Sequence, residues 1–558
     1  MARLTTLALI PGLISTAAAE FGLAGQLFQL SGASSVNNAK LAWAPVSGAS
    51  SYRVEQSIGN GAYTTLGTVP GDTYDSYGLT MGSNYNFRVT ALNGNSQVDQ
   101  SSIASLTPYA PQGSYNTYDN TQESSLLIKP NLEDNGVYYK YNYETASNGS
   151  FSRFQEQTST DGYNFSGDKT VLTGQVVCAS TNYSCKLERV SFQKNPTTGD
   201  FVMWAHFERS QDYSLGEVAV AHGKPGEALT FDGAFQPLGD DSRDMAFFVD
   251  GEKGYLVTST DTNTNNNIYS MTSNWTAIDK RLTQVNVNGH REAPAVIKSN
   301  DWYYLFTSRA AGWLPSQPQY IAAQDMAGPW GDPVNVANIA TFCAQSGGVN
   351  QLDSGNFQMS ADRWSANWPT KGGPTRQLNL PMSLSPEGGF ASYHFYRTVK
   401  YSDDISTAGQ GIYGVQTGKI LSNGKPSSSD AGTQNISLAN DGTQSVPNSF
   451  FKPSKVPFWY QIDLQDAHTI SEIDLTTNMV QGSETFYRFN VTGSTDGKTF
   501  TSLADQSSNT SPGFVPSFPT STEKFRYIRI NVAAIINNNN GNEADFASGV
   551  TEVTVYGS

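Results

Sequence analysis

A crude repeat in the middle of the chain constrains the fold more than any other feature. From residue 111 to residue 410, a strand rich in Tyr or Trp, a turn and a second strand recur roughly every 50 residues. That period is typical of propeller blades with four strands each, although a large sandwich also shows strand alternation. Evenly spaced sheets need radial closure to protect their edges, so we predict a five-bladed β-propeller. The repeated strands include Val137 to Tyr143, Phe201 to Phe207, Gly254 to Ser259, Asp301 to Thr307 and Asn356 to Ser360.

The segments on either side of the repeat also consist of alternating strands. Residues 20–110 carry Trp43 on an early strand and Tyr85 at the position of a tyrosine corner, and they resemble a fibronectin type III domain. Residues 411–558 contain Trp459-Tyr460-Gln461-Ile462-Asp463-Leu464 and Arg526-Tyr527-Ile528-Arg529. They resemble the discoidin-like domain (coagulation factor C type), a jelly-roll sandwich used widely to bind carbohydrate. We therefore predict an all-β chain in which two sandwiches flank the propeller.

Charge and composition narrow the class of partner. The formal net charge of −15 would repel nucleic acid and anionic membranes, so we expect neither as a partner. The acidic balance fits a secreted protein that acts on a neutral polymer, and we expect a monomer. Charged residues make up only 15% of the chain, while Gly, Ser, Thr, Asn and Tyr abound, a mixture that suits β-sandwiches and propellers.

The N-terminus indicates export. Residues 1–19 read as a signal peptide, with Arg3, an apolar stretch from Leu4 to Ile14, and Ala17-Ala18-Ala19 before the cleavage site. No later segment reaches the length of apolar sequence that spans a bilayer. We therefore expect a secreted, extracellular protein. Seven glycosylation sequons agree with that location: Asn148, Asn164, Asn182, Asn274, Asn435, Asn490 and Asn509.

The three cysteines predict one disulfide and no metal site. Cys178 and Cys185 are close enough in sequence to close a small loop in an oxidising compartment, which leaves Cys343 unpaired. The scattered cysteines and histidines do not have the spacing of zinc ligands.

Three acidic residues occupy similar local contexts. Glu188, Asp244 and Glu292 each stand beside an arginine and just before an apolar, strand-like run. Any one of them could form an ordinary strand-end salt bridge. In an all-β chain, however, carboxylates at strand starts can converge on one pocket, and cleavage of a glycosidic bond needs an acid and a second charged group.

These acids belong to a longer series of motifs. Through this series the middle region resembles glycoside hydrolase family 43 and, within that family, the exo-β-1,3-galactanase subgroup. Order and spacing hold over about 250 residues. The series comprises Glu188-Arg189, Asn195 to His206, Pro237-Leu238-Gly239, Ser242-Arg243-Asp244-Met245, Arg291-Glu292-Ala293-Pro294, Tyr303-Tyr304, Ser308, Gly312-Trp313, Gly328-Pro329-Trp330, Ala344-Gln345-Ser346 and Asp362-Arg363-Trp364.

The resemblance implies catalytic roles and an inverting mechanism without a cofactor. Glu292 matches the general acid that protonates the departing oxygen, and its pKa should be raised by burial or nearby negative charge. Asp244 matches the carboxylate that tunes this acid, and Arg243 is expected to hold Asp244. Gln345 matches a glutamine that positions water, while Glu188 would stabilise developing positive charge.

The chain departs from the wider family in the first blade. No aspartate stands in Gln122-Glu123-Ser124-Ser125-Leu126-Leu127, where most of the family has its catalytic base, and the His-Gly-Gly of the subgroup is also missing. Glu123 is a second candidate for the base. Three further residues match positions that contact the sugar. Glu144 matches an acidic residue that contacts an axial hydroxyl, and Tyr213 and Asn266 are weaker matches. Trp313 and Trp364 could stack on sugar rings, although tryptophans in propellers are more often core residues.

Three functions stay open at this point. The resemblance favours release of galactose from β-1,3-galactan, the polysaccharide core of arabinogalactan. An α-L-arabinofuranosidase or β-xylosidase on the same scaffold is the first alternative, and a non-catalytic galactan-binding lectin is the second. Asn440-Asp441-Gly442 in the C-terminal domain occupies the position where relatives bind a structural calcium ion.

Overall fold

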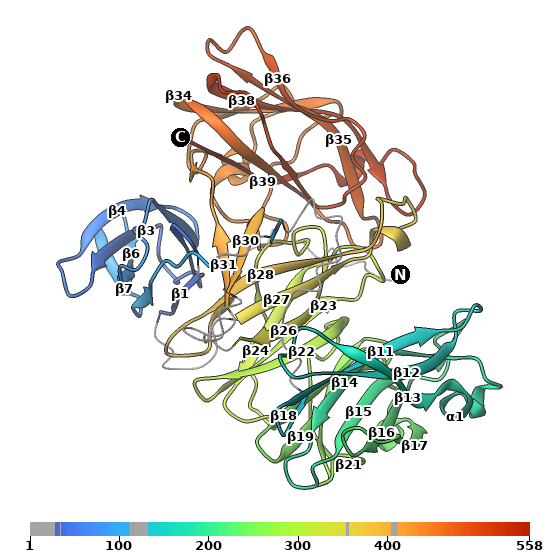
Figure 1. Ribbon diagram of the computed structural model, residues 1–558. Helices are drawn as coiled ribbons and strands as arrows, with labels where there is room; N and C mark the ends of the chain where they lie inside the picture. Colours follow the sequence, from blue (N-terminus) through green and yellow to red (C-terminus); the bar gives the residue numbers. More distant parts are fainter. Residues whose placement is uncertain (1–27, 34, 112–114, 117–131, 353–356, 403–410) are drawn as a thin grey trace, which may run out of the picture.

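The computed structural model describes residues 28–33, 35–111, 115–116, 132–352, 357–402 and 411–558 (Figure 1). Strands form nearly all of the regular structure of these residues, and their only α-helix is the short α1 (Gly174–Val177). No helix among them is long and apolar enough to cross a membrane. The predicted signal peptide and the first-blade residues Gln122 and Glu123 lie outside the described residues. The described chain is therefore all-β, as the sequence predicts.

The N-terminal unit is a sandwich of two antiparallel sheets. Trp43 is buried between them, and its ring centroid lies 5.5 Å from that of Tyr52. The Tyr85 hydroxyl accepts a hydrogen bond from the Thr80 N–H (2.9 Å), the contact that defines a tyrosine corner. One sheet has the order β1-β2-β5, and the other has the order β4-β3-β6-β7, with β8 paired to β6. The strands are β1 (Leu30–Ala33), β2 (Asn38–Trp43), β3 (Ser51–Ile58), β4 (Thr64–Val69), β5 (Thr73–Tyr77), β6 (Tyr85–Asn93), β7 (Ser96–Gln100) and β8 (Ala104–Leu106).

Five consecutive four-stranded antiparallel sheets make up the middle of the described chain, each pairing its strands in sequence order. The first is β10 (Glu133–Asp134), β11 (Val137–Thr145), β12 (Phe151–Ser159) and β13 (Ser166–Thr173). The second is β14 (Cys185–Lys194), β15 (Phe201–Arg209), β16 (Glu217–Gly223) and β17 (Thr230–Phe235). The third is β18 (Met245–Asp250), β19 (Lys253–Thr260), β20 (Asn265–Met271) and β21 (Ile278–Val285). The fourth is β22 (Arg291–Ser299), β23 (Trp302–Arg309), β24 (Pro318–Ala323) and β25 (Val334–Asn335). The fifth is β26 (Gln345–Gln351), β27 (Phe357–Arg363), β28 (Arg376–Leu384) and β29 (Ala391–Tyr393).

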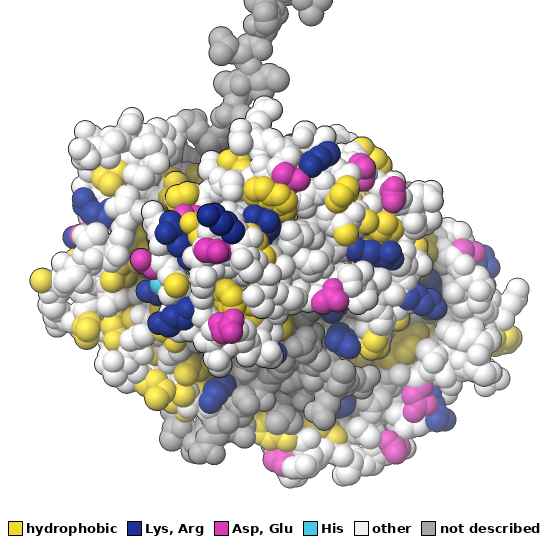
Figure 2. Space-filling view, turned by 90° about the horizontal axis from the view of Figure 1, so that it is seen from above, with side chains coloured by type: hydrophobic (Ala, Val, Ile, Leu, Met, Phe, Trp, Pro, Cys, Tyr) yellow, Lys and Arg dark blue, Asp and Glu magenta, His cyan; other side chains and the backbone are white. Residues whose placement is uncertain are grey.

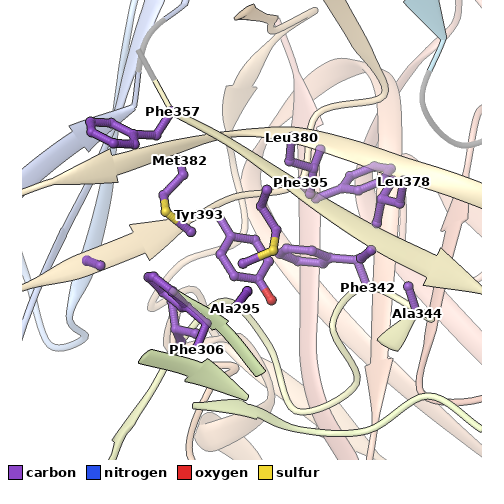
Figure 3. Packing of buried hydrophobic residues seen from close by; sticks show 14 of the residues in the cluster. Ala295, Phe306, Phe342, Ala344, Phe357, Leu378, Leu380, Met382, Tyr393 and Phe395 are labelled. Atoms are coloured by element: carbon purple, nitrogen blue, oxygen red, sulfur yellow. The ribbon is translucent and has the colours of Figure 1, made fainter. Parts of the chain in front are cut away.

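Apolar clusters fill the space between each sheet and the next. Aromatic pairs bridge successive sheets, such as Trp204 of the second sheet and Phe247 of the third, whose ring centroids are 6.5 Å apart. Between the fourth and fifth sheets, Phe306, Phe342 and Tyr393 belong to one cluster (Figure 3). The first strands β14, β18, β22 and β26 also contact one another in that order. This packing brings the starts of four strands, distant in sequence, next to each other.

The C-terminal unit is an eight-stranded β-sandwich above the middle region in Figure 1. The two sequence motifs of this unit lie on the paired strands β34 and β38. Arg526 of β38 forms a two-pronged ion pair with Asp463 of β34, at 2.7 and 2.8 Å. A small sheet of order β31-β30-β9 connects it to the rest, with β9 (Tyr115–Asn116), β30 (Thr398–Ser402) and β31 (Gly411–Val415). The strands of the sandwich are β32 (Lys419–Ile420), β33 (Ser427–Ser429), β34 (Phe458–Thr477), β35 (Thr485–Ser494), β36 (Thr501–Gln506), β37 (Phe514–Ser517), β38 (Lys524–Asn537) and β39 (Val550–Gly557).

Cys178 and Cys185 form a disulfide at the start of the second sheet, and Cys343 is a free, buried thiol. On the face seen from above, acidic and basic side chains lie interspersed among polar ones (Figure 2). The described residues on that face therefore form no continuous basic surface of the kind that binds a phosphate backbone.

Candidate active site

Four predicted catalytic residues lie at the starts of neighbouring first strands. Glu188 is on β14, Asp244 directly precedes β18, Glu292 is on β22, and Gln345 begins β26. Because these strands pack against one another in this order, the four side chains reach one region of the molecule from four sheets. Hydrogen bonds through Arg189 and the Ala293 N–H connect Asp244, Glu292 and Gln345, whereas Glu188 has separate partners.

A β-bulge interrupts three of these strands, β14, β22 and β26, at the site. The register slips by one residue between Glu188 and Ser191, between Glu292 and Ala295, and between Ser346 and Gly348. A bulge bends the strand and redirects the side chains beside it. In two of the three bulges a residue other than glycine adopts the left-handed region, Arg189 and Ala293, each with φ of +51°. Backbone strain of this kind clusters at functional sites.

The Arg189 guanidinium connects three of the sheets. Its Nη2 donates to Asp244 Oδ2 at 3.1 Å and to Gln345 Oε1 at 3.4 Å, and its Nη1 lies 3.6 Å from Asp362 Oδ2. Asp244 Oδ2 also accepts from the backbone N–H of Ala293 at 3.0 Å, which adds the fourth sheet. One cation therefore holds two carboxylates and the amide that contacts Glu292.

Glu292 is a buried carboxyl with neutral hydrogen-bond partners. It is 7% exposed, and its Oε1 accepts from Gln345 Nε2 at 2.7 Å and from the Ala311 N–H at 3.3 Å. Its Oε2 accepts from Asn263 Nδ2 at 3.2 Å. Burial first, and then the negative charge of Asp244, raises the pKa of Glu292 to about 8 against the opposing effect of nearby arginines. A carboxyl in this environment is protonated near neutral pH, as a general acid requires.

The Gln345 amide has a fixed orientation. Its Oε1 accepts from Trp364 Nε1 at 2.9 Å as well as from Arg189, so its Nε2 is left to face Glu292. Because two donors bond to the same end of the amide, that end is the oxygen and the other end is the nitrogen. The second hydrogen of Nε2 is then available for a water or a substrate oxygen.

Glu188 lies in the opposite electrostatic environment from Glu292. Its Oε1 accepts from the Tyr213 hydroxyl at 2.9 Å and lies 3.5 Å from Lys186 Nζ, while its Oε2 is 3.4 Å from His206 Nδ1. Burial alone would raise the pKa of Glu188, but His206, Lys186 and Tyr213 outweigh burial and lower this pKa to about 2. The side chain is 34% exposed, so Glu188 is an ionised carboxylate open to solvent.

His206 lies between two carboxylates. It is buried, and its Nε2 contacts Glu208 Oε1 at 3.1 Å on the side away from Glu188. Burial would lower the pKa of His206, but the contacts with Glu188 and Glu208 reverse that effect and raise the pKa. The raised pKa favours the protonated imidazole, whose positive charge would support the ionised form of Glu188.

Two predicted contacts are wrong in detail. Arg243 does not hold Asp244: its Nη1 lies 3.2 Å from Glu208 Oε1 and donates to the Tyr213 carbonyl, because the chain turns its side chain toward the second sheet. Asn266 is fully buried, and its amide is used by Ser259, Asn286 and the Arg291 carbonyl, which leaves it no surface for a sugar. Asn263, three residues earlier, is the asparagine that contacts the acid.

The other predicted sugar contacts differ in how near they lie to the acids. Tyr213 is bonded to Glu188 and is 39% exposed, and Trp364 is bonded to Gln345. Trp313 is 49% exposed on the segment that follows Ala311. Glu144 instead forms an ion pair with Arg153 of the neighbouring strand, with Oε2 and Nε 2.7 Å apart. Tyr213 and Trp364 thus contact residues of the site, while the roles of all four as sugar contacts stay predictions.

Several site residues were not given a role by the sequence analysis. Arg189 and Asp362 appear in the motifs, yet only the fold shows that they form one ion-pair network across sheets. Glu208, His206 and Asn263 are likewise connected to the acids by contacts between strands or loops. The available signal was an arginine directly after Glu188, which alone does not reveal its partner. Within the described ranges, no group of three or more His, Cys, Asp or Glu side chains could hold a metal ion.

Comparison with known families supports the two outer domains. Residues 26–107 match the family described as fibronectin type III domain, and residues 424–547 match the F5/8 type C domain. The chain thus carries a fibronectin type III domain and a C-terminal F5/8 type C domain, as predicted. A comparison with curated proteins finds no match.

Solved structures similar to this chain include three enzymes from different organisms. An exo-β-1,3-galactanase from Clostridium thermocellum is 23% identical, with a TM-score of 0.48, and the match covers 80% of this chain and 97% of that one. The exo-β-1,3-galactanase from Phanerochaete chrysosporium with β-1,3-galactotriose is 21% identical, with a TM-score of 0.49 and coverage of 80% and 100%. A putative exo-β-1,3-galactanase from Bifidobacterium bifidum is 22% identical, with a TM-score of 0.42 and coverage of 54% and 99%.

The Arg189 network predicts a strong effect of one substitution. Arg189→Met keeps the length of the side chain but leaves Asp244 and Asp362 without their shared cation. We expect a loss of unfolding free energy on the order of 3 kcal/mol, because breaking a largely buried ion pair leaves uncompensated charge. Arg153→Met is the matched control, since its pair with Glu144 is exposed and contributes less than about 1 kcal/mol. Equal losses in urea unfolding of the two variants would contradict the role of Arg189.

Proposed function

We propose that this protein is a secreted glycoside hydrolase of family 43 that releases galactose from the end of β-1,3-galactan with inversion at the anomeric carbon. The observation that carries the proposal is the buried Glu292 carboxyl, whose pKa is raised to about 8 beside the ionisable Asp244 and the oriented Gln345 amide. The motif series around these residues supports the choice of family and substrate.

Glu292 supplies the proton in this mechanism. When the glycosidic bond breaks, the departing oxygen takes the proton of the Glu292 carboxyl, so the leaving group departs as a neutral alcohol. The Asp244 charge keeps that proton on Glu292 before the reaction. Arg189 and the Ala293 N–H hold Asp244 in place, so its charge acts from a fixed position.

Gln345 and Glu188 take the remaining roles in this mechanism. The motif series assigns Gln345 to positioning the attacking water, while Glu188 faces the positive charge that develops on the ring. A carboxylate with a pKa of about 2 is a weak proton acceptor, so Glu188 suits electrostatic stabilisation better than general-base catalysis. The attacking water then loses its proton to solvent after the new bond forms.

The domain arrangement fits a polysaccharide-degrading enzyme. In this proposal the five sheets are the blades of a closed propeller spanning residues 111–410, with the fibronectin type III domain at 20–110 and the F5/8 type C domain at 411–558. The latter acts as a carbohydrate-binding module that keeps the polymer near the site. The protein acts as a monomer.

Two accessory features belong to the same proposal. Cleavage after Ala19 and glycosylation would follow from secretion, and the mass of the protein recovered from culture medium checks both. A structural calcium ion beside Asp441 is the second feature, since the Gly442 N–H next to it donates to the buried Glu552 carboxyl of β39 at 3.2 Å, which places a second acidic group near this loop. An unchanged melting temperature after chelation would argue against the ion.

Glu292→Gln tests the general acid. On β-1,3-galactobiose we expect kcat to fall by roughly 10²–10⁴, the usual contribution of a general acid. On a dinitrophenyl β-galactoside, whose leaving group needs no proton, the loss should be much smaller. Melting curves check that the variant is folded. Equal losses on the two substrates would rule out Glu292 as the acid, and wild-type cleavage of aryl arabinofuranosides or xylosides instead of galactosides would overturn the substrate assignment.

The pH profile tests the electrostatic coupling of Asp244 and Glu292. Glu292 must be protonated, so kcat/KM should fall as pH rises through about 8. Asp244→Asn removes the nearby negative charge, which lowers the pKa of Glu292 and should shift this decline to lower pH. Asp168→Asn, a surface change away from the acids, is the control and should leave the decline in place. An unshifted decline in Asp244→Asn would contradict the coupling.

A further inference from the structure

Two loops of the middle region contact the catalytic groups directly. The loop after β23, which we name the Ala311 loop, carries the Ala311 N–H that donates to Glu292 Oε1 at 3.3 Å. The loop after β27, which we name the Trp364 loop, begins with the indole whose Nε1–H donates to Gln345 Oε1 at 2.9 Å. Both loops therefore border the side of the site on which Glu292 and Gln345 lie.

One corner of the F5/8 type C domain bonds to both of these segments. The corner comprises the loop between β34 and β35 and the turn after β38, residues 478–484 and 538–541. Gln481 Oε1 accepts a hydrogen bond from Nη2 of Arg309, the residue directly before the Ala311 loop. Asn538 Oδ1 accepts from the Thr370 N–H of the Trp364 loop at 3.1 Å, and its carbonyl accepts from Thr370 Oγ1 at 3.0 Å. A second domain thus reaches the edge of the candidate active site.

Hydrogen bonds within the corner hold its two parts together. The Asn538 N–H donates to the Glu484 carbonyl at 2.8 Å, and Asn539 Nδ2 lies 3.3 Å from Glu484 Oε2. The Gly482 N–H donates to the other carboxyl oxygen of Glu484 at 2.9 Å. A side chain on a braced loop loses less conformational entropy when it binds a ligand than one on a loose loop. Gln481, directly before Gly482, therefore has a supported position.

A small pocket marks where the corner faces the Ala311 loop. Its volume is about 60 Å³, too small for a sugar ring, so it is a seam between the domains. Ala311 lines the pocket from one side and Gln481 from the other. The F5/8 type C domain therefore approaches the residue that bonds directly to Glu292.

Exposed groups on the two sides of this seam suit a neutral sugar chain. Trp313 of the Ala311 loop is 49% exposed, and its carbonyl accepts from Trp368 Nε1 at 2.8 Å, which joins the two loops. Gln481 is exposed on the opposite side. Because an arginine has only donors, the end of the Gln481 amide that meets Arg309 is the oxygen, and Nε2 is the end that can donate to a sugar hydroxyl.

The position of the acid gives the direction of the polymer. Glu292, in the proposed reaction, protonates the oxygen that joins the terminal galactose to the remaining chain, so that chain lies beside Glu292. We propose that the corner of the F5/8 type C domain completes the substrate cleft on this side, with Gln481 Nε2 donating to a sugar beyond the cleaved bond. This role rests on the proposed function and extends it, because Gln481 then favours longer chains over short ones.

Steady-state kinetics on substrates of different length test the role of Gln481. Gln481→Ala should lower kcat/KM on β-1,3-galactotetraose roughly three- to tenfold, mainly through KM, as expected for one lost hydrogen bond. On a dinitrophenyl β-galactoside, which has no further sugar, kcat/KM should be unchanged. Gln465→Ala is the matched control, because Gln465 is an exposed glutamine of the same domain whose Oε1 also accepts from a cation, Lys425 Nζ, at 2.7 Å. Melting curves check that each variant is folded.

Two results would overturn the proposal. An unchanged preference of Gln481→Ala for galactotetraose over the aryl galactoside would mean that the amide does not reach the substrate. An equal loss on both substrates would mean that Gln481 only holds the domains together. A wild-type protein that releases no galactose from either substrate would overturn the proposed function and the role of Gln481 together.

Calorimetric titration of the Glu292→Gln form separates affinity from turnover. Adding Gln481→Ala to this form should weaken the binding of β-1,3-galactotetraose by the same factor. Galactose fills only the position before the cleaved bond, so its binding should not change, and Gln465→Ala should affect neither ligand. Unchanged affinity for galactotetraose in the Gln481→Ala form would contradict a contact with the longer chain.

Discussion

The guanidinium of Arg189 is the interaction on which the candidate site depends. It meets Asp244, Asp362 and Gln345, which come from two other sheets, and through Asp244 it also fixes the backbone of the fourth sheet at Ala293. Without this cation, Asp244 and Asp362 would repel each other in a site that is mostly shielded from water. Several carboxyls can share this small region because one positive charge lies at its centre.

Two glutamates in this site illustrate how surroundings decide chemistry. Glu188 lies beside His206 and Lys186 and is a carboxylate, whereas Glu292 is buried among amide groups and backbone N–H groups and keeps its proton. Pairs of carboxyls whose pKa values are pushed apart are characteristic of acid–base sites. The β-bulges make this difference possible, because they turn the Glu188 and Glu292 side chains out of the regular strand alternation.

The F5/8 type C domain contacts both the fibronectin type III domain and the middle region. Lys40 of the fibronectin type III domain donates to the Tyr556 hydroxyl of the F5/8 type C domain at 3.2 Å, and Thr370 of the middle region bonds to Asn538 of that domain. These contacts join the F5/8 type C domain to both of the other domains. The relative placement of the domains thus shapes surfaces on both sides of the middle region.

The sequence by itself determined the all-β class of fold and singled out the candidate acids. Strand alternation, the tyrosine corner at Tyr85 and the paired motifs of the C-terminal sandwich are local patterns, so they could be interpreted without the fold. The motif context of Glu188, Asp244, Glu292 and Gln345 was local in the same sense. Only the tertiary structure decided that Arg189, not Arg243, holds Asp244, and that Asn266 is buried. Those partners come from different sheets or domains, and a linear pattern carries no information about which side chain will meet a residue a hundred positions away.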